Sequence, residues 1–310
     1  MDPAAARELL EQRARTRARE QAIRRRLTGE ERTYARWLLR QADGGTPLTR
    51  AQLAELEARW NRTVRSQVAA VETGVQQAAA AGERDAVRLM GQLGQRVAGG
   101  PEQVGTAVIR EALRPGARLP RLLERRFTDS PAAPARAAAM LRDGFAAGKG
   151  PRELAETIAE ATRADLRTVE RIARTEMLRT HRETTRAAYQ QDDAVSGWRW
   201  LAAADDRTCA VCWALHGSEH RLDEPMPAHP NCRCAIVPIL QGRAGELTAI
   251  EPGPDRFARL PAAQQRQILG PGAHDRYQRG ELDLPDLVAV RRNPVWGDTV
   301  ARRPLRDLPG

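Results

Sequence analysis

The stretch of sequence that decides the fold is Cys209-Ala210-Val211-Cys212, followed after a loop by His229-Pro230-Asn231-Cys232-Arg233-Cys234. All four cysteines of the 310-residue chain fall within these two segments. A chain that clusters its cysteines in this way and is made in a reducing compartment more often binds a metal than forms disulfides. The segments therefore predict a metal-binding knuckle.

The spacing of the donors sharpens this prediction. Two residues separate Cys209 from Cys212 and His229 from Cys232, and 16 residues lie between the two pairs, a gap typical of zinc sites. These four residues form a Cys3His set that would bind Zn2+ tetrahedrally. A rival set exchanges His229 for Cys234. Because four protein ligands would leave no open position, we expect a structural zinc; cysteines without metal, reduced or paired in disulfides, are the alternative.

Strands are expected on both sides of the knuckle. Trp198 and Trp200 alternate with Arg199, so the two indoles should share one face of a strand. Residues 235–240 form a second apolar run, and Pro238 within it favours an edge position in the sheet. A helix capped by Asp165 and running to about Gln191 should precede this small sheet.

Further out, the N-terminal part of the chain predicts long helices. One runs from Ala4 to Leu27, and Thr28 followed by Glu31 is a capping-box pattern that should open a second. A third follows Thr49, with apolar residues three or four apart as far as about Leu93. Aromatic residues make up 4% of the chain, which suits helices packed on small residues. The fold class is α+β and mostly α: long N-terminal helices, a helical core with a small antiparallel sheet and the Cys/His knuckle, and a short helical C-terminal tail.

The net charge of +10 is unevenly distributed. Residues 1–130 hold 24 arginines against 16 acidic residues, whereas residues 131–248 are neutral and residues 249–310 carry +2. We therefore predict a basic helical region over 1–130, a motif-bearing domain over 131–245 and a tail over 246–310. No apolar run approaches the roughly 20 residues that span a bilayer, so no membrane contact is expected.

The basic contact candidates are Arg24, Arg25 and Arg26. One interpretation is a solvated helix face in an arginine-rich chain. The others are contact with the phosphates of double-stranded DNA or with an acidic protein surface, and arginine geometry suits either partner. Aromatic residues for base stacking are scarce nearby, so phosphate contact without base readout is the most that this pattern predicts.

A charged cluster is expected around Glu176. Glu176 and Arg179 stand at a helical ion-pair spacing, and Arg174 flanks them. A carboxylate with a raised pKa in a cleft is one interpretation. The favoured one is a partly buried carboxylate held by arginines, because a single glutamate without a partner acid, base or nucleophile defines no reaction.

Enzymatic interpretations of the Cys/His window are weaker. A zinc deaminase needs His-x-Glu before Pro-Cys-x-x-Cys, and here the Cys-x-x-Cys comes first. His216 and His220 lie in a polar loop with no visible orienting partner for a cysteine nucleophile. A His-Asn nuclease built on His216, His229 and Asn231 stays open as an alternative, although His229 would then have to serve as both base and ligand.

Together, these motifs resemble one protein family. They comprise Arg171-Ile172-Ala173-Arg174-Thr175-Glu176, Tyr189, Trp198, Asp206-Arg207-Thr208-Cys209-x-x-Cys212, Leu215-His216-Gly217 and the closing segment 229–234. The pattern is similar to the phage Mu F-like minor head, or head-morphogenesis, proteins of tailed phages and prophages. The resemblance covers roughly residues 135–240, and residues 257–296 also resemble tails found after this domain.

The resemblance implies a non-catalytic virion protein. It would lie in the capsid interior near the portal protein, contact capsid or scaffold proteins, and assist head assembly and DNA packaging or delivery. The family does not settle whether the Cys/His cluster holds metal, so that prediction rests on spacing alone. A salt-dependent DNA-binding accessory protein remains an alternative alongside the nuclease.

Overall fold

The computed structural model describes residues 2–42, 49–95, 101–114, 117–130, 151–242, 250–292 and 297–308, together with residues 133, 136, 139, 140 and 143. The chain divides into two compact units. Unit 1 comprises residues 1–14, 78–108 and 178–310, and unit 2 comprises residues 15–77 and 109–177. This division differs from the three ranges expected from charge and motifs, which stay predictions.

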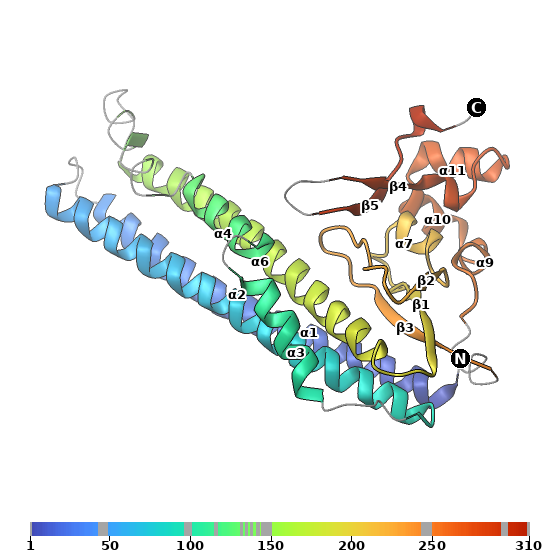
Figure 1. Cartoon of the computed structure of the whole chain (residues 1–310). Coiled ribbons are helices and arrows are strands. Elements are labelled where there is room, and N and C mark those ends of the chain that lie inside the picture. The colour runs from blue at the N-terminus through green and yellow to red at the C-terminus, as the bar shows by residue number, and fades with distance from the viewer. Residues whose placement is uncertain are drawn as a thin grey trace. The chain divides into compact units, whose positions relative to one another are not determined.

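Three long helices contribute residues to both units: α1 (Pro3–Ala42), α2 (Arg50–Gln92) and α6 (Pro151–Tyr189). Two shorter helices lie between α2 and α6 in the described residues, α3 (Pro101–Leu113) and α4 (Arg118–Thr128) (Figure 1). With the small antiparallel sheet described below, the mostly helical α+β class is confirmed. No helix among the described residues is both long and apolar enough to cross a membrane.

Helix packing builds unit 2. Tyr34 of α1 lies against Trp60 of α2 with ring centroids 5.6 Å apart, and Phe127 of α4 meets Trp60 edge-on at 6.4 Å. Gly74 of α2 allows a close approach, because a Cβ there would meet the sulfur of Met177 and the side chain of Ile23. Bulkier side chains at this position would separate α2 from its neighbours.

The N-terminal helix is longer than the sequence predicts. The expected break at Thr28 is wrong, since α1 continues from Pro3 to Ala42. The Thr28 hydroxyl donates to the carbonyl of Arg24 at 2.7 Å, so it bonds back along the helix and does not cap a new one. Thr49 caps the next helix. The backbone N–H of Gln52 donates to the Thr49 hydroxyl at 3.2 Å, and the backbone N–H of Thr49 donates to the side-chain oxygen of Gln52. The predicted third helix is α2.

A second predicted helix start is also wrong. Asp165 does not open a helix but lies inside α6, which is continuous from Pro151 to Tyr189. Its carboxylate is buried and engages the Ser130 hydroxyl and the Arg126 guanidinium. These tertiary partners replace the backbone amides that a capping aspartate would bind, so the local signal is overridden.

Unit 1 contains a three-stranded antiparallel sheet. The strands β1 (Val195–Leu201), β2 (Glu219–Arg221) and β3 (Ala235–Leu240) lie in the order β2-β1-β3. Trp198 and Trp200 are fully buried on β1, as their alternation predicts. Pro238 lies on β3, which is an edge strand as expected.

The tail folds into short elements: α9 (Gly253–Ala258), α10 (Ala262–Leu269), α11 (Pro271–Gln278), η1 (Leu284–Leu287), β4 (Val288–Arg291), β5 (Thr299–Arg302) and η2 (Leu305–Asp307) (Figure 1). The short helices were expected from the sequence, whereas the β4–β5 hairpin was not. A second apolar core forms around Phe257, which meets Trp213 at 6.0 Å and Tyr277 at 5.6 Å. The tail is therefore packed onto the segment that carries Cys212.

Candidate metal centre

The cysteines and His229 converge in unit 1 from two short segments. Cys209 precedes the five-residue helix α7 (Ala210–Ala214) and Cys212 lies within it. His229 and Cys232 come from the turn before β3. The Nε2 atom of His229 is 3.3 Å from the sulfurs of both Cys209 and Cys212, and the sulfurs of Cys212 and Cys232 are 3.9 Å apart.

These separations fit a tetrahedral ion. Two thiolates bound to one Zn2+ would lie about 3.8 Å apart, and a thiolate and an imidazole nitrogen about 3.5 Å apart, from the usual bond lengths. The donors form two overlapping groups, Cys209–Cys212–His229 and Cys212–Cys232–Cys234, in which all donor atoms lie within 4.8 Å of one another. This Cys/His group could hold a metal ion, and Cys212 belongs to both groups. None of the four cysteines is in a disulfide.

The backbone orients His229 through a tight turn. The amide of Cys232 donates to the carbonyl of His229 at 3.1 Å across Pro230 and Asn231. Asn231 has φ of 64°, a left-handed conformation that asparagine tolerates better than most residues. The Nδ1 atom of His229 donates to the carbonyl of Pro230 at 2.8 Å, which directs Nε2 toward the sulfurs.

A carboxylate–guanidinium pair joins the two cysteine-bearing segments. Asp205 accepts two hydrogen bonds from Arg233, at 2.5 and 2.9 Å, and one from the Thr208 hydroxyl at 3.0 Å. Burial of this carboxylate opposes its ionisation, but the hydrogen bonds and charge of Arg233 hold the pKa of Asp205 below its usual range. Asp205 therefore ties the start of the first segment to the residue between Cys232 and Cys234.

Arg182 supports the second segment from α6. It is 5% exposed, and its guanidinium donates to the carbonyls of Cys232 and Cys234 at 3.3 and 3.1 Å. No spacing in the sequence marks this arginine, because its partners are backbone atoms 50 and 52 residues further along the chain. Sequence reasoning missed both Arg182 and the Asp205–Arg233 pair.

The electrostatics of the cluster favour the thiolates of Cys209 and Cys232, whereas hydrogen bonds with neighbouring cysteines and burial raise the pKa values of Cys212 and Cys234. Hydrogen bonding with Cys212, together with the hydrogen bond and charge of His229, lowers the pKa of the Cys209 thiol to about 4. Burial disfavours the imidazolium, but the hydrogen bond with Cys209 and the nearby cysteine charges raise the pKa of His229 to about 9. The thiolate is the form of cysteine that binds metals, so Cys209 is already in the protonation state that a metal requires.

The three residues of the nuclease alternative make contacts that hold the fold. His216 is buried, and its Nδ1 accepts from the Ala202 amide at 3.0 Å. Burial lowers the pKa of His216 to about 4, so the ring is neutral at physiological pH. Asn231 forms the turn described above, and His229 lies among the sulfurs. His220 was expected in a loop but lies on β2, where its ring stacks on Trp198 with centroids 4.1 Å apart.

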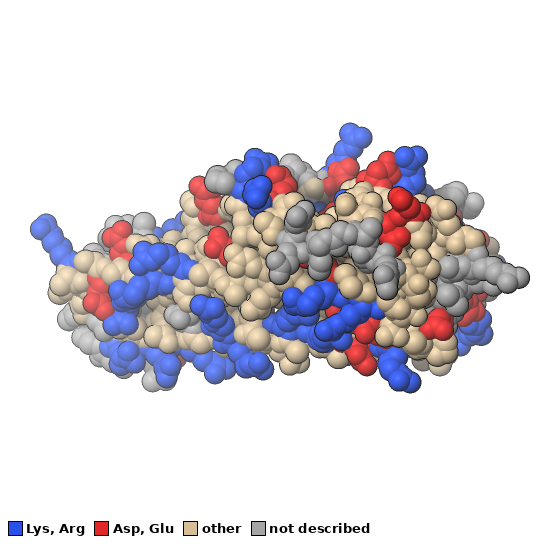
Figure 2. Space-filling model, turned by 60° about the horizontal axis from the view of Figure 1, so that its bottom comes forward, with Lys and Arg blue, Asp and Glu red and all other residues tan. Residues whose placement is uncertain are grey.

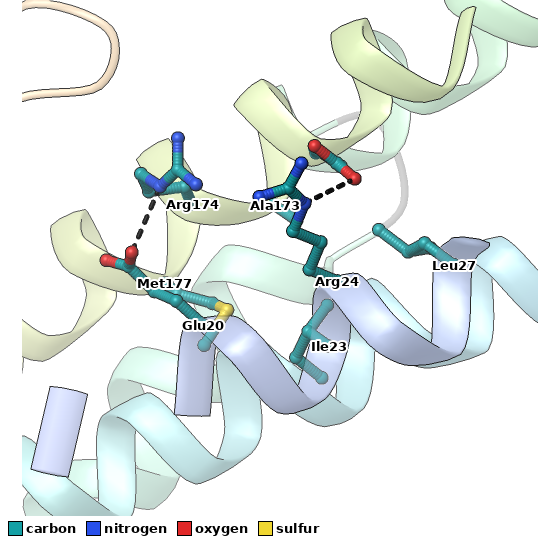
Figure 3. Close-up of a pocket in the computed structure, with 8 residues that line it drawn as sticks. Glu20, Ile23, Arg24, Leu27, Ala173, Arg174 and Met177 are labelled. Atoms are coloured by element: carbon teal, nitrogen blue, oxygen red, sulfur yellow. Dashed lines mark hydrogen bonds and ion pairs between the residues drawn. The ribbon is translucent and has the colours of Figure 1, made fainter. Parts of the chain in front are cut away.

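Two residues of the charged cluster predicted around Glu176 form ion pairs with residues of other helices. Glu176 is buried and accepts from Arg118 of α4 at 2.7 Å, while Arg174 donates to Glu20 of α1 at 3.0 Å (Figure 3). Both pairs lie within unit 2, whereas Arg179 belongs to unit 1. Spacing along a single helix could not predict Arg118 or Glu20 as partners. The role of Arg174, Glu176 and Arg179 as one structural ion-pair cluster stays a prediction.

The basic candidates Arg24, Arg25 and Arg26 are all exposed. Arg24 donates to Glu170 of α6 at 3.3 Å, beside the Arg174–Glu20 pair (Figure 3). The two pairs border a small hollow whose apolar lining includes Ile23, Leu27, Ala173 and Met177. Because Arg24 makes an interhelical contact, it differs from the neighbouring Arg25, which points away from the buried face of α1.

Fold and site together define a mostly helical protein whose small sheet carries a Cys/His centre suited to a metal ion. Comparison with known families extends this description. Residues 137–237 match the family model described as "Phage Mu protein F like protein", so this segment is phage Mu F-like and the resemblance expected from its motifs is confirmed.

One curated relative shares part of the chain. It is "NAD(+)--arginine ADP-ribosyltransferase EFV" of Enterococcus faecalis (strain ATCC 700802 / V583), which is 30% identical over 123 residues. The match covers 34% of this chain and 25% of that protein, so the chain spans about a quarter of the relative's length. No solved structure matches the chain.

Proposed function

We propose that this protein is a minor head protein of a tailed phage or prophage, present in the virion and acting near the portal in head assembly and in DNA packaging or delivery. The single observation that carries the proposal is the phage Mu F-like segment at residues 137–237, which contains all the donors of the Cys/His centre.

The proposed role is non-catalytic. This proposal is supported by the contacts of the candidate catalytic residues, which serve the fold. His216 is buried and accepts from a backbone amide, Asn231 shapes a turn, and His229 lies among the cysteines. The arginine ADP-ribosyltransferase relative shares only a quarter of its length with this chain, which is too little to carry its activity over. Assays for DNA cleavage with added divalent metals and for NAD+-dependent modification of arginine should both be negative.

The metal that we propose for the centre is zinc, in a structural role. The ligands would be Cys209, Cys212, His229 and Cys232, with Cys234 as the alternative ligand. Support comes from the two cysteine-bearing segments, whose donor separations suit a tetrahedral ion and whose thiolate-rich composition suits zinc. Four protein ligands leave no position for substrate or water. Elemental analysis of protein purified without chelators should find about one zinc per chain.

The assembly role can be tested with the genes encoded beside this one. Co-expression with the neighbouring portal, capsid and scaffold genes should yield heads that contain this protein in few copies, measured by quantitative mass spectrometry of purified particles. Pull-down of the purified portal by the full chain tests the proposed partner directly. Heads that assemble normally and contain none of the protein would contradict the proposal.

A further inference from the structure

The outer face of α1 in unit 2 carries a row of arginines. Arg25, Arg32, Arg36 and Arg40 are exposed and stand seven, four and four residues apart, so they recur on one side of the helix. The opposite side of the same helix is buried through Ile23, Leu27, Tyr34 and Trp37. We call the four arginines the α1 arginine row.

The row differs from other arginines of unit 2 in its surroundings. Arg24, Arg118 and Arg174 each pair with a glutamate on another helix. Within the part of the chain whose side chains are described, no ion pair involves a member of the row, and Arg36 bonds only the carbonyl of Arg32. The positive charge of the row is therefore not neutralised by described acidic groups. The space-filling view likewise shows basic side chains outnumbering acidic ones on the face that it draws (Figure 2).

The rest of this face is small or polar. Gly29 and Thr33 lie between the arginines and Ala22 lies one turn before Arg25, all three exposed. The nearby aromatic residues Tyr34 and Trp37 are buried on the other side. A protein interface usually has aromatic or apolar anchors at its centre, and this face has none among the described residues. Single-stranded nucleic acid is usually held by stacking on aromatic rings, which this face also lacks.

The geometry points to duplex DNA as the partner of this face: we infer that the α1 arginine row binds the phosphate backbone of double-stranded DNA without reading its sequence. From Arg25 to Arg40 the helix rises about 22 Å, a length that covers about six phosphates of one strand. The inference deepens the proposed role in DNA packaging or delivery by naming the surface involved.

The test compares two variants of the full chain that lose the same charge. The first combines Arg25→Gln, Arg32→Gln, Arg36→Gln and Arg40→Gln. The control combines Arg221→Gln, Arg266→Gln, Arg279→Gln and Arg306→Gln, four exposed arginines of unit 1 that each pair with an acidic neighbour. Circular dichroism should show both variants folded, because glutamine is a good helix former at exposed positions.

Binding of a 30-base-pair duplex is measured by fluorescence anisotropy over a series of salt concentrations. The slope of log affinity against log salt should become shallower by about 3.6 in the row variant, since each phosphate contact contributes about 0.9 on B-form DNA. Affinity at about 0.1 M salt should fall by more than about tenfold. The control should keep the wild-type slope, and a third variant with lysine at the four row positions should retain most of it.

Three outcomes would overturn the inference. They are a wild-type chain that binds neither duplex DNA nor poly-glutamate, a control variant that loses as much of the slope as the row variant, and a wild-type chain that binds poly-glutamate but not DNA. The last would assign the row to an acidic protein surface. Any of these leaves the assembly role intact if the protein is still found in purified heads. DNA binding by a protein absent from heads would reject the proposed function instead.

Discussion

The two compact units use arginine in opposite ways. In unit 1, Arg182 and Arg233 are buried or half-buried beside the Cys/His centre and donate to backbone carbonyls and to Asp205. In unit 2, Arg25 and Arg32 lie on the outer face of α1 with no described acidic partner. The same side chain therefore stabilises a small, loop-rich region in one unit and provides an unneutralised surface in the other.

The difference follows from what each unit has available for a core. Unit 2 packs long helices through Tyr34, Trp60 and Phe127, and the arginines of the α1 arginine row lie outside this core. The Cys/His centre of unit 1 is built from a five-residue helix and a short turn, and these two short elements pack onto the sheet and the tail. Small regions of this kind usually need a metal or disulfides to hold their fold. The comparison can be tested by changing one unit at a time.

The largest effect should come from Cys212→Ser, because Cys212 belongs to both donor groups. A structural zinc site contributes an apparent free energy of about 10–16 kcal/mol, which is comparable with the whole stability of a domain at about 5–15 kcal/mol. We expect loss of the metal, measured by elemental analysis, and loss of the near-ultraviolet circular dichroism contributed by Trp198, Trp200 and Trp213 of unit 1. Unit 2 should keep its helices.

The control for this substitution is Cys234→Ser. With Cys209, Cys212, His229 and Cys232 as ligands, the Cys234→Ser variant should retain about one metal per chain. If the Cys234→Ser variant loses the metal while His229→Ala keeps it, the rival ligand set with Cys234 is correct. A Cys212→Ser variant that still binds one ion would reject the site.

A smaller effect is expected for Gly253→Ala, which tests the docking of the tail. A Cβ at Gly253 would overlap the carbonyl of Trp213 and the side chain of His216. Overpacking of this kind costs about 1–3 kcal/mol, so α9 should move away from α7. Limited proteolysis should then cut within residues 253–308 faster than in the wild type. Gly272→Ala is the matched control in the same tail, because its Cβ would make only an ordinary contact with Leu305.

Replacing Asp205 with asparagine should cost about 1–3 kcal/mol, the usual range for hydrogen bonds to a charged group, reduced because the pair is partly exposed. The pKa of this carboxyl is lower in the folded protein than its ordinary value. Its stabilisation is therefore present above about pH 4 and is lost as the pH falls further. Thermal unfolding at pH 7 and at pH 3 should show a difference between wild type and variant that shrinks at pH 3. A constant difference would contradict the role of the charge.

The smallest effect is expected for Arg24→Gln in unit 2. The Arg24–Glu170 pair is exposed on the arginine side, and surface pairs contribute about 0–1 kcal/mol. Urea unfolding should therefore show a change below about 1 kcal/mol, and DNA affinity should fall less than for any two substitutions in the α1 arginine row. A change as large as that of Asp205→Asn would mean that charge pairs matter equally in both units.

The predicted fold class, the helix α2, the strands β1 and β3 and the short tail helices are all present in the structure. The two predicted helix starts that failed, at Thr28 and Asp165, share a cause. Each residue has a side chain that caps helices well, but Thr28 bonds back to Arg24 and Asp165 is held by Ser130 and Arg126. A local signal for a helix start does not determine which partner the side chain takes in the folded protein.

The candidate metal site was predictable because its donors repeat at short, regular spacings. Cys209, Cys212, His229 and Cys232 were expected to meet, and their donor atoms lie in two overlapping groups that share Cys212. The supporting contacts were not predictable. Arg182 bonds carbonyls on a segment about 50 residues away, and Asp205 meets Arg233 across 28 residues. Nothing local to these residues marks such pairs.

The sequence by itself determined the residue types, the periodicity of the helices and the two cysteine-bearing segments, because these depend on spacings of a few residues. It also located the excess charge in the N-terminal region. Only the tertiary structure decided which arginines are neutralised and which remain exposed. That outcome depends on which helix faces pack together and which carboxylates they bring within about 4 Å, and such distances are fixed by the fold and not by neighbours along the chain.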